Sequence, residues 1–255
     1  MWFRFLCLMV VALSSSLYAE NPFAGKWKID EAKSHFTGTI DSVKAAGPNT
    51  WTFQYGAFSW TLKGDGTDQP TPFGTTALKV VSPTTWQLTS KTNGRPTGTE
   101  TWELAPDGKS MTRTFTGKQE NGAPFKGVAV MKRIAGKQGF KGTWESTEVK
   151  MTFTEVDIAP NGDDGVTVSL PEDGTHYSLK FDGKDYPEEG PRIPAGVTVS
   201  GKLTGPRKAT VTTKFNGKVF DHEEWEVSPD GKTFTYTERD EGAPKAVVVV
   251  LNRME

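Results

Sequence analysis

A pattern of aromatic, glycine and turn residues that occurs twice along the chain constrains its fold more than any other feature. The first copy begins with Phe-Ala-Gly-Lys-Trp at 23–27, and Phe-x-Gly-x-Trp returns 117 positions later at 140–144. Later matches keep the chain order at an offset of 123, as in Trp-Glu-Leu at 102–104 and Trp-Glu-Val at 225–227. The offset changes only between matched blocks, where loops tolerate insertions. The chain is therefore predicted to contain one fold used twice.

The boundary between the two copies falls in the short segment 134–139, so that residues 20–136 form repeat 1 and residues 137–255 form repeat 2. About 115 residues per repeat are enough to bury a hydrophobic core. The single cysteine, Cys7, lies ahead of both repeats, so each core has to form without a disulfide bond. We expect each repeat to fold as a domain.

Regular turn signals within each repeat predict short antiparallel strands. Asn93-Gly94 and Asp107-Gly108 stand 14 residues apart, and the equivalent turns at 216–217 and 230–231 keep that spacing. Such dipeptides favour the positive φ angles of two-residue hairpins. Eight or nine strands are expected in repeat 1, near 24–30, 39–45, 50–55, 58–63, 77–81, 84–91, 97–105, 110–117 and 125–133. Sequential hairpins favour an all-β fold of two tandem up-and-down antiparallel β-barrels, because closure removes exposed edges; a β-sandwich is the alternative.

Each repeat also opens with Gly-x-Trp and closes with an arginine. The first motif is Gly25/Trp27 with Arg133 at the end of repeat 1, and the second is Gly142/Trp144 with Arg253 at the end of repeat 2. This pattern resembles the signature of the calycin superfamily, the lipocalins and fatty-acid-binding proteins, and the chain is similar to small exported bacterial lipocalin-like proteins. The resemblance implies that each tryptophan closes a barrel floor and that the terminal arginine packs across it. We therefore expect Trp27 to stack near Arg133, and Trp144 near Arg253. Both repeats are shorter than a typical lipocalin and lack its later motifs.

Residues 1–19 have the order of a secretory signal peptide. Arg4 precedes an apolar run from Phe5 to Leu17, and the small residue Ala19 stands just before Glu20. Cleavage there predicts an exported protein, periplasmic or extracellular, without a membrane span after cleavage. The whole chain has a formal net charge of −1, and loss of Arg4 makes it −2. Nothing in this balance favours nucleic acid or an anionic membrane as a partner.

The motifs of common enzymes and metal sites are missing from the sequence. There is no Gly-x-Ser-x-Gly, no Walker loop and no dinucleotide-binding fingerprint. His222-Glu223-Glu224 lacks the second histidine of His-Glu-x-x-His, and repeat 1 has Thr99 in place of His222. We therefore predict no catalytic residues, no metal site and no cofactor.

Two groups of residues in repeat 1 are candidates for a ligand pocket. Glu100 shares the parity of Trp102 and Leu104, so all three should point inward, and Glu223 repeats this arrangement in repeat 2. An inward carboxylate orients a ligand or pairs with a buried arginine; the alternative is a wetted, inert position at the barrel rim. Aromatic residues alternate along a hairpin and either line a pocket or pack in the core; they are Trp51, Phe53, Tyr55, Phe58 and Trp60.

These observations predict non-catalytic binding of a small apolar or amphipathic molecule inside a barrel. Repeat 1 is the better candidate because repeat 2 lacks most of the hairpin aromatics. The predicted ligand-binding residues are Trp51, Phe53, Trp60, Trp102 and Glu100. Two alternatives remain: an isomerase or cyclase acting on an apolar substrate in the same cavity, and a structural exported protein with filled barrels.

Overall fold

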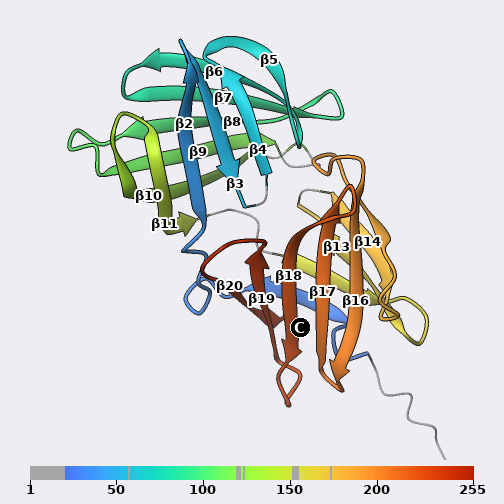
Figure 1. The fold of residues 1–255 in the computed structure, drawn as a ribbon. Helices are drawn as coiled ribbons and strands as arrows, with labels where there is room; N and C mark the ends of the chain where they lie inside the picture. The colour runs from blue at the N-terminus through green and yellow to red at the C-terminus, as the bar shows by residue number, and fades with distance from the viewer. Residues whose placement is uncertain (1–20, 57, 119–121, 123, 151–154, 173) are drawn as a thin grey trace, which may run out of the picture.

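The computed structural model describes residues 21–56, 58–118, 122, 124–150, 155–172 and 174–255. The predicted signal peptide, residues 1–19, lies outside the described residues. The described chain forms twenty strands, arranged as two barrel-like antiparallel sheets (Figure 1). Within these ranges, no helix is long and apolar enough to cross a membrane. The all-β prediction of two tandem up-and-down barrels is confirmed.

Ten strands form each sheet. The N-barrel contains β2 (Ile40–Gly47), β3 (Thr50–Tyr55), β4 (Phe58–Lys63), β5 (Asp65–Thr71), β6 (Gly74–Ser82), β7 (Thr85–Thr92), β8 (Arg95–Leu104), β9 (Ser110–Lys118), β10 (Pro124–Gln138) and β11 (Lys141–Lys150). The C-barrel contains β1 (Gly25–Ile29), β12 (Glu155–Pro160), β13 (Gly165–Leu170), β14 (Thr175–Lys180), β15 (Tyr186–Glu189), β16 (Val197–Gly205), β17 (Lys208–Phe215), β18 (Lys218–Val227), β19 (Thr233–Asp240) and β20 (Val247–Arg253).

The two barrels close in different ways. In the C-barrel a continuous ladder returns to its start, because β1 pairs with both β12 and β20. The N-barrel is nearly closed: its ladder runs from β4 to β5, and these two edge strands are not paired with each other in the sheet. The side chain of Gln69 spans this seam: its Nε2 donates to the backbone oxygen of Lys63 at 2.8 Å, and its Oε1 accepts from the backbone nitrogen at 2.7 Å. One side-chain amide thus supplies bonds that a ladder would otherwise make.

The first strand of each repeat lies in the barrel of the other repeat. β1 belongs to repeat 1 but sits between β12 and β20, and β11 belongs to repeat 2 but sits between β10 and β2. Residues 134–139 are the end of β10 and its tight turn into β11, with Gln138 paired to Lys141. Because this hairpin holds β11 beside β10, β1 fills the position between β12 and β20 in the C-barrel. The repeats 20–136 and 137–255 therefore do not coincide with the two sheets.

The exchange of strands corrects our expectation for the barrel floors. The guanidinium of Arg253 lies 4.1 Å from the ring centroid of Trp27, and that of Arg133 lies 4.1 Å from Trp144. The pairs Trp27–Arg133 and Trp144–Arg253 were wrong, although the stacked Trp–Arg floor is present in both barrels. Both indoles are fully buried, and each arginine also donates to backbone carbonyls, including Gly108 for Arg133 and Gly231 for Arg253.

The ends of the barrels opposite these floors face each other. In the N-barrel, β8 starts at the turn 93–94 and runs toward the floor at Gly108. In the C-barrel, β18 likewise starts at the turn 216–217 and runs toward the floor at Gly231. The amide of Asn93 donates to the backbone oxygen of Ile193 in the C-barrel at 3.2 Å. Aromatic rings join the two ends, with Phe58 5.6 Å from Phe215 and 5.3 Å from Phe220 between centroids. The barrels are therefore joined mouth to mouth.

Candidate functional site

Two adjoining cavities lie where the open ends of the barrels meet. The first has a volume of about 450 Å³ and is lined by inward residues of both barrels, such as Val43 and Met131 from one and Val249 from the other. The second, of about 420 Å³, extends into the N-barrel. Five residues line both cavities, so we treat them as one chamber: Phe53, Trp60, Trp102, Arg113 and Phe115. Ligand pockets have volumes of roughly 300–1,000 Å³ and mostly apolar walls, so the chamber has the size and lining of a binding site.

Most of the predicted ligand-binding residues lie at this chamber. Phe53, Trp60 and Trp102 line both cavities, and Glu100 lines the second. Phe53 and Trp60 face each other from adjacent strands β3 and β4, with stacked rings 6.0 Å apart. Trp51 is absent from the lining of either cavity, and its ring instead packs 4.5 Å from that of Trp86.

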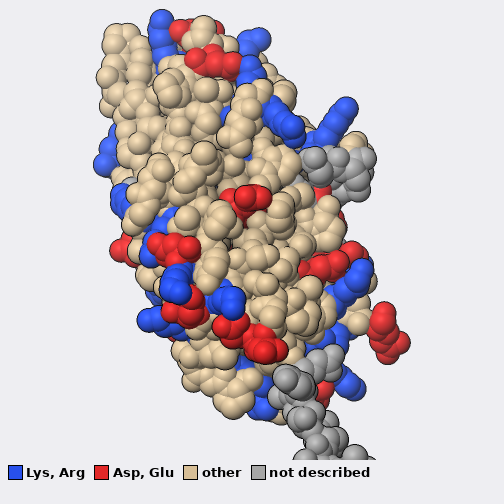
Figure 2. All heavy atoms as spheres, turned by 90° about the vertical axis from the view of Figure 1, so that its right-hand side faces the viewer, with Lys and Arg blue, Asp and Glu red and all other residues tan. Residues whose placement is uncertain are grey.

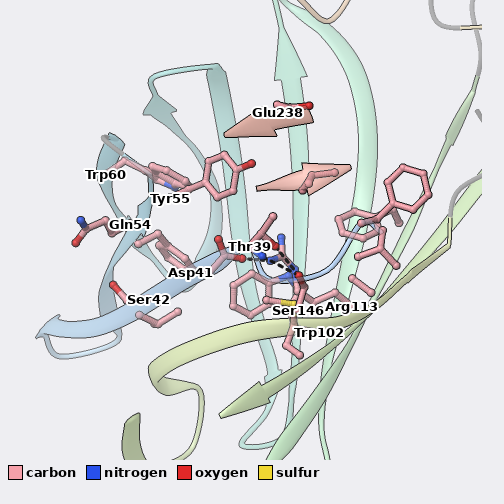
Figure 3. A pocket seen from close by; sticks show the side chains of 18 of the residues that line it. Thr39, Asp41, Ser42, Gln54, Tyr55, Trp60, Trp102, Arg113, Ser146 and Glu238 are labelled. Atoms are coloured by element: carbon pink, nitrogen blue, oxygen red, sulfur yellow. Dashed lines mark hydrogen bonds and ion pairs between the residues drawn. The ribbon is translucent and has the colours of Figure 1, made fainter. Parts of the chain in front are cut away.

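The inward carboxylate of the N-barrel is paired with a buried arginine. Glu100 accepts hydrogen bonds from the indole of Trp102 at 2.6 Å and from Nε of Arg113. The same guanidinium donates to Asp41 on β2 and lies 4.7 Å from the ring centroid of Trp102 (Figure 3). The side chains of Arg113, Glu100 and Asp41 are 17%, 19% and 13% exposed. One cation thus serves two carboxylates at the wall of the chamber.

Electrostatics inside this group favour the charged arginine. Burial by itself lowers the pKa of Arg113, but Glu100 and Asp41 outweigh that effect and raise it above its usual value. Burial raises the pKa of Asp41, and Arg113 opposes that rise. Sequence reasoning missed Arg113, although it alternates on β9 with Met111 and Phe115, whose inward parity it shares.

The C-barrel keeps the carboxylate but has no arginine at the equivalent position. Trp225 donates to Glu223 at 2.5 Å, as Trp102 does to Glu100. At the offset of 123, Arg113 is replaced by Tyr236 and Phe115 by Glu238, and both replacements line the first cavity.

Four carboxyls follow one another along the inner faces of β18 and β19. Their register pairs Asp221 with Asp240 and Glu223 with Glu238 across the two strands. The aspartates replace two glycines of repeat 1, Gly98 and Gly117. We call these four residues the acidic ladder. Glu238 is the member that reaches the chamber wall, together with Tyr55 from the N-barrel (Figure 3).

Burial and mutual repulsion raise the pKa values of the acidic ladder. Burial raises the pKa of Asp221 to about 6 and that of Glu223 to about 8, and in each case a neighbouring aspartate adds to the rise. The same causes raise the pKa of Glu238 well above its usual value. Burial also raises the pKa of Asp240, opposed by a hydrogen bond from the Tyr55 hydroxyl.

Comparisons with known proteins give no family for this chain. No protein-family model matches it, and no curated protein is significantly similar to it. Among the described residues, no group of three or more histidine, cysteine, aspartate and glutamate side chains is placed to hold a metal ion. The site is thus defined by its own geometry: an aromatic chamber with a paired carboxylate in one barrel and an acidic ladder in the other.

Proposed function

We propose that the protein binds a small apolar or amphipathic molecule in the chamber between its two barrels. The observation that carries this proposal is the pair of adjoining cavities, about 450 and 420 Å³, with shared aromatic walls. Apolar pockets with a few polar groups are the usual form of small-molecule sites. The Trp–Arg floors support a calycin-like origin for both barrels, and binding inside the barrel is what that resemblance implies.

Titration of residues 20–255 with fatty acids, isoprenoids and an environment-sensitive apolar dye tests the proposal. We expect saturable binding at one site, weakened by Trp60→Ala or Trp102→Ala while circular dichroism shows the fold retained. Trp51→Ala is the matched control for Trp60→Ala, because both tryptophans lie on one hairpin but only Trp60 lines the chamber. Absence of saturable binding across the whole panel would refute the proposal.

A second candidate function, an isomerase acting on an apolar substrate, is favoured by Glu238. This carboxyl lines the chamber, and burial raises its pKa well above the usual value, which favours the protonated form. One oxygen of the protonated carboxyl would donate its proton to one carbon of a substrate double bond, while the other oxygen accepts a proton from the allylic carbon beside the second alkene carbon, so that the carboxyl ends protonated as it began. Incubation of isoprenoids in D₂O would then give isomers carrying one deuterium, lost with Glu238→Gln. Recovery of every substrate unchanged would exclude this reaction for the panel.

We also propose that the protein is exported after removal of residues 1–19. The support is the order of Arg4, an apolar run and Ala19 before Glu20. Mass measurement of the exported protein should find a chain that starts at or near Glu20. Exported protein that retains Met1 would contradict this.

A further inference from the structure

We propose that the ligand of the chamber carries an organic cation, a protonated amine, which the acidic ladder of the C-barrel holds. This inference rests on the proposed binding function and names the class of ligand. The hydrocarbon part would lie against Phe53 and Trp60, and the ammonium group would enter the C-barrel beside Glu238.

The first argument is the register of the ladder. Asp221 stands opposite Asp240, and Glu223 opposite Glu238, on the inner face of neighbouring antiparallel strands. Like charges directly opposite each other destabilise a sheet. Such pairs persist in a barrel interior only if protons or a cation compensate them.

The second argument is that two buried oxygens of the ladder have no partner. Asp221 and Asp240 are only 5% and 8% exposed. Within the described chain, the Oδ1 atom of each has no hydrogen-bond partner. Buried polar atoms are nearly always hydrogen-bonded, so each exception requires an explanation. An ammonium group, with three N–H donors, supplies the missing donors.

The third argument comes from the other copy of the repeat. In the N-barrel, the guanidinium of Arg113 bridges Glu100 and Asp41 at the chamber wall. The C-barrel has Tyr236 at that position. The same scaffold therefore carries its own cation in one barrel and additional carboxyls in the other. A ligand's ammonium group would do in the C-barrel what Arg113 does in the N-barrel.

The groups around the ladder leave it negative when it ionises. The charges that act on Asp221, Glu223 and Glu238 are those of the other ladder members and of Glu188 on β15, apart from a small effect of His222. Tyr177 on β14, Tyr236 on β19 and Tyr55 on β3 face the ladder as neutral phenols with raised pKa values. Thr213 on β17 donates to Asp221.

The acidity of this site is local. Over the whole chain, basic and acidic residues nearly balance, with a net charge of −1. On the face shown in Figure 2, the two signs are interspersed around a largely uncharged middle. The ladder is therefore a concentration of one sign of charge inside the molecule, next to an apolar wall, which matches a ligand with one charged end.

Proton release is a signature of this mode of binding. Burial raises the pKa of Asp221 to about 6 and that of Glu223 to about 8, so Glu223 holds a proton near pH 7. A bound cation stabilises the ionised carboxylates and lowers those pKa values. Binding of an amine should therefore release protons, which calorimetry detects as a dependence of the binding heat on the ionisation enthalpy of the buffer.

The experiment compares decylamine, decanol and decanoate as probes of residues 20–255 by calorimetry at about pH 9 and about pH 5. The higher pH lies above the pKa values of Asp221 and Glu223, about 6 and about 8, and the lower pH lies below both. At the higher pH we expect decylamine to bind about tenfold more tightly than decanol or better, as for one charge-assisted contact. Protonation of the ladder should reduce this preference at the lower pH. Glu238→Gln should also reduce this preference, measured as the ratio of the decylamine and decanol affinities of the same variant.

Glu224→Gln is the matched control, because Glu224 lies on the same strand but points outward and is exposed. Saturable decanol binding without a preference for decylamine would overturn the cation inference and leave the proposed function standing. Failure of all three probes would remove the proposed function and the inference with it. Binding of calcium chloride alone, competing with decylamine, would replace the amine by a metal ion and also overturn the inference.

Discussion

The two barrels differ in the group that faces the inward carboxylate near the chamber: an arginine in one barrel and another acid in the other. In the N-barrel, the inward carboxylate Glu100 shares the guanidinium of Arg113 with Asp41. In the C-barrel, the equivalent Glu223 faces another acid, Glu238, and both hold protons more tightly than usual. Both barrels share one strand plan, and the copies differ at four inward positions of the strand pairs β8–β9 and β18–β19: Gly98/Asp221, Arg113/Tyr236, Phe115/Glu238 and Gly117/Asp240. The comparison teaches that the N-barrel sets a side-chain cation against its inward carboxylates, whereas the C-barrel has carboxyls with raised pKa values in that place.

The first prediction asks whether the two barrels can be separated at all. Residues 20–136 and 137–255, expressed apart, should each unfold cooperatively. The reason is that β1 and β11 carry the same Gly-x-Trp motif, so each repeat can close with its own first strand. Denaturant titration of each half tests this, and an unfolded pair of halves would show that the exchanged strands make the barrels interdependent.

The second prediction assigns each floor tryptophan to a barrel. Trp27→Ala should lower the free energy of unfolding by about 3–5 kcal/mol, as for a large buried aromatic. Because Trp27 packs on Arg253, the loss should fall on the C-barrel. Hydrogen exchange resolved by peptide would locate it, with Trp144→Ala as the matched variant for the N-barrel. A loss confined to the N-barrel after Trp27→Ala would contradict the exchange of first strands.

The third prediction concerns the buried cation of the N-barrel. Arg113→Met leaves Glu100 and Asp41 buried without their shared partner, which should cost up to about 3–5 kcal/mol. The control is Arg239→Met, since Arg239 lies on β19 and is exposed. Denaturant unfolding measures both variants. Equal, small effects would mean that Arg113 does not compensate the two acids.

The fourth prediction uses the pH dependence of the acidic ladder. Asp221 and Glu223 bind protons more tightly in the folded chain than in the unfolded chain, because burial raises their pKa values to about 6 and about 8. Their contribution to the free energy of unfolding is therefore greatest at low pH and is lost as pH rises through those values. Thermal unfolding from about pH 5 to about pH 9 should show falling stability. Glu223→Gln should flatten the upper part of that fall; an unchanged slope would contradict the assignment.

Much of the fold followed from short-range signals. The Asn93-Gly94 and Asn216-Gly217 turns predicted two hairpins, and both asparagines have the positive φ that such turns require, 52° and 50°. Strands expected at 50–55 and 58–63 are β3 and β4 as found. β5 was missed because its sequence, Asp-Gly-Thr-Asp-Gln-Pro-Thr, has neither alternation nor β-branched apolar residues.

The exchange of first strands was beyond the reach of the sequence. Both repeats carry the same Gly-x-Trp motif, so the pattern fits either partner equally well. The choice depends on the tight turn between β10 and β11, at residues that we had interpreted as a boundary between domains.

The candidate site was only half visible in the sequence. Glu100, Glu223 and the aromatic hairpin were found by parity, because an apolar neighbour two residues away marks the inward face. Arg113 and Glu238 carry the same signal on β9 and β19, yet charged residues are normally assigned to the surface. Arg113 is two residues from the buried Met111, and Glu238 is four residues from the buried Phe234, so strand alternation places both side chains on the inward face.

The measurement that tests the central claim most directly transfers the cation of the N-barrel into the C-barrel. Tyr236→Arg places a guanidinium where repeat 1 has Arg113, and Tyr236→Gln changes the same position without adding charge. Calorimetry with decylamine and decanol at about pH 9, above the pKa values of Asp221 and Glu223, compares the two variants. We predict that Tyr236→Arg loses the preference for decylamine and that Tyr236→Gln keeps it, with decanol binding similar in both. An equal preference for decylamine in the two variants would contradict the claim that the ammonium group of a ligand takes, in the C-barrel, the place that Arg113 has in the N-barrel.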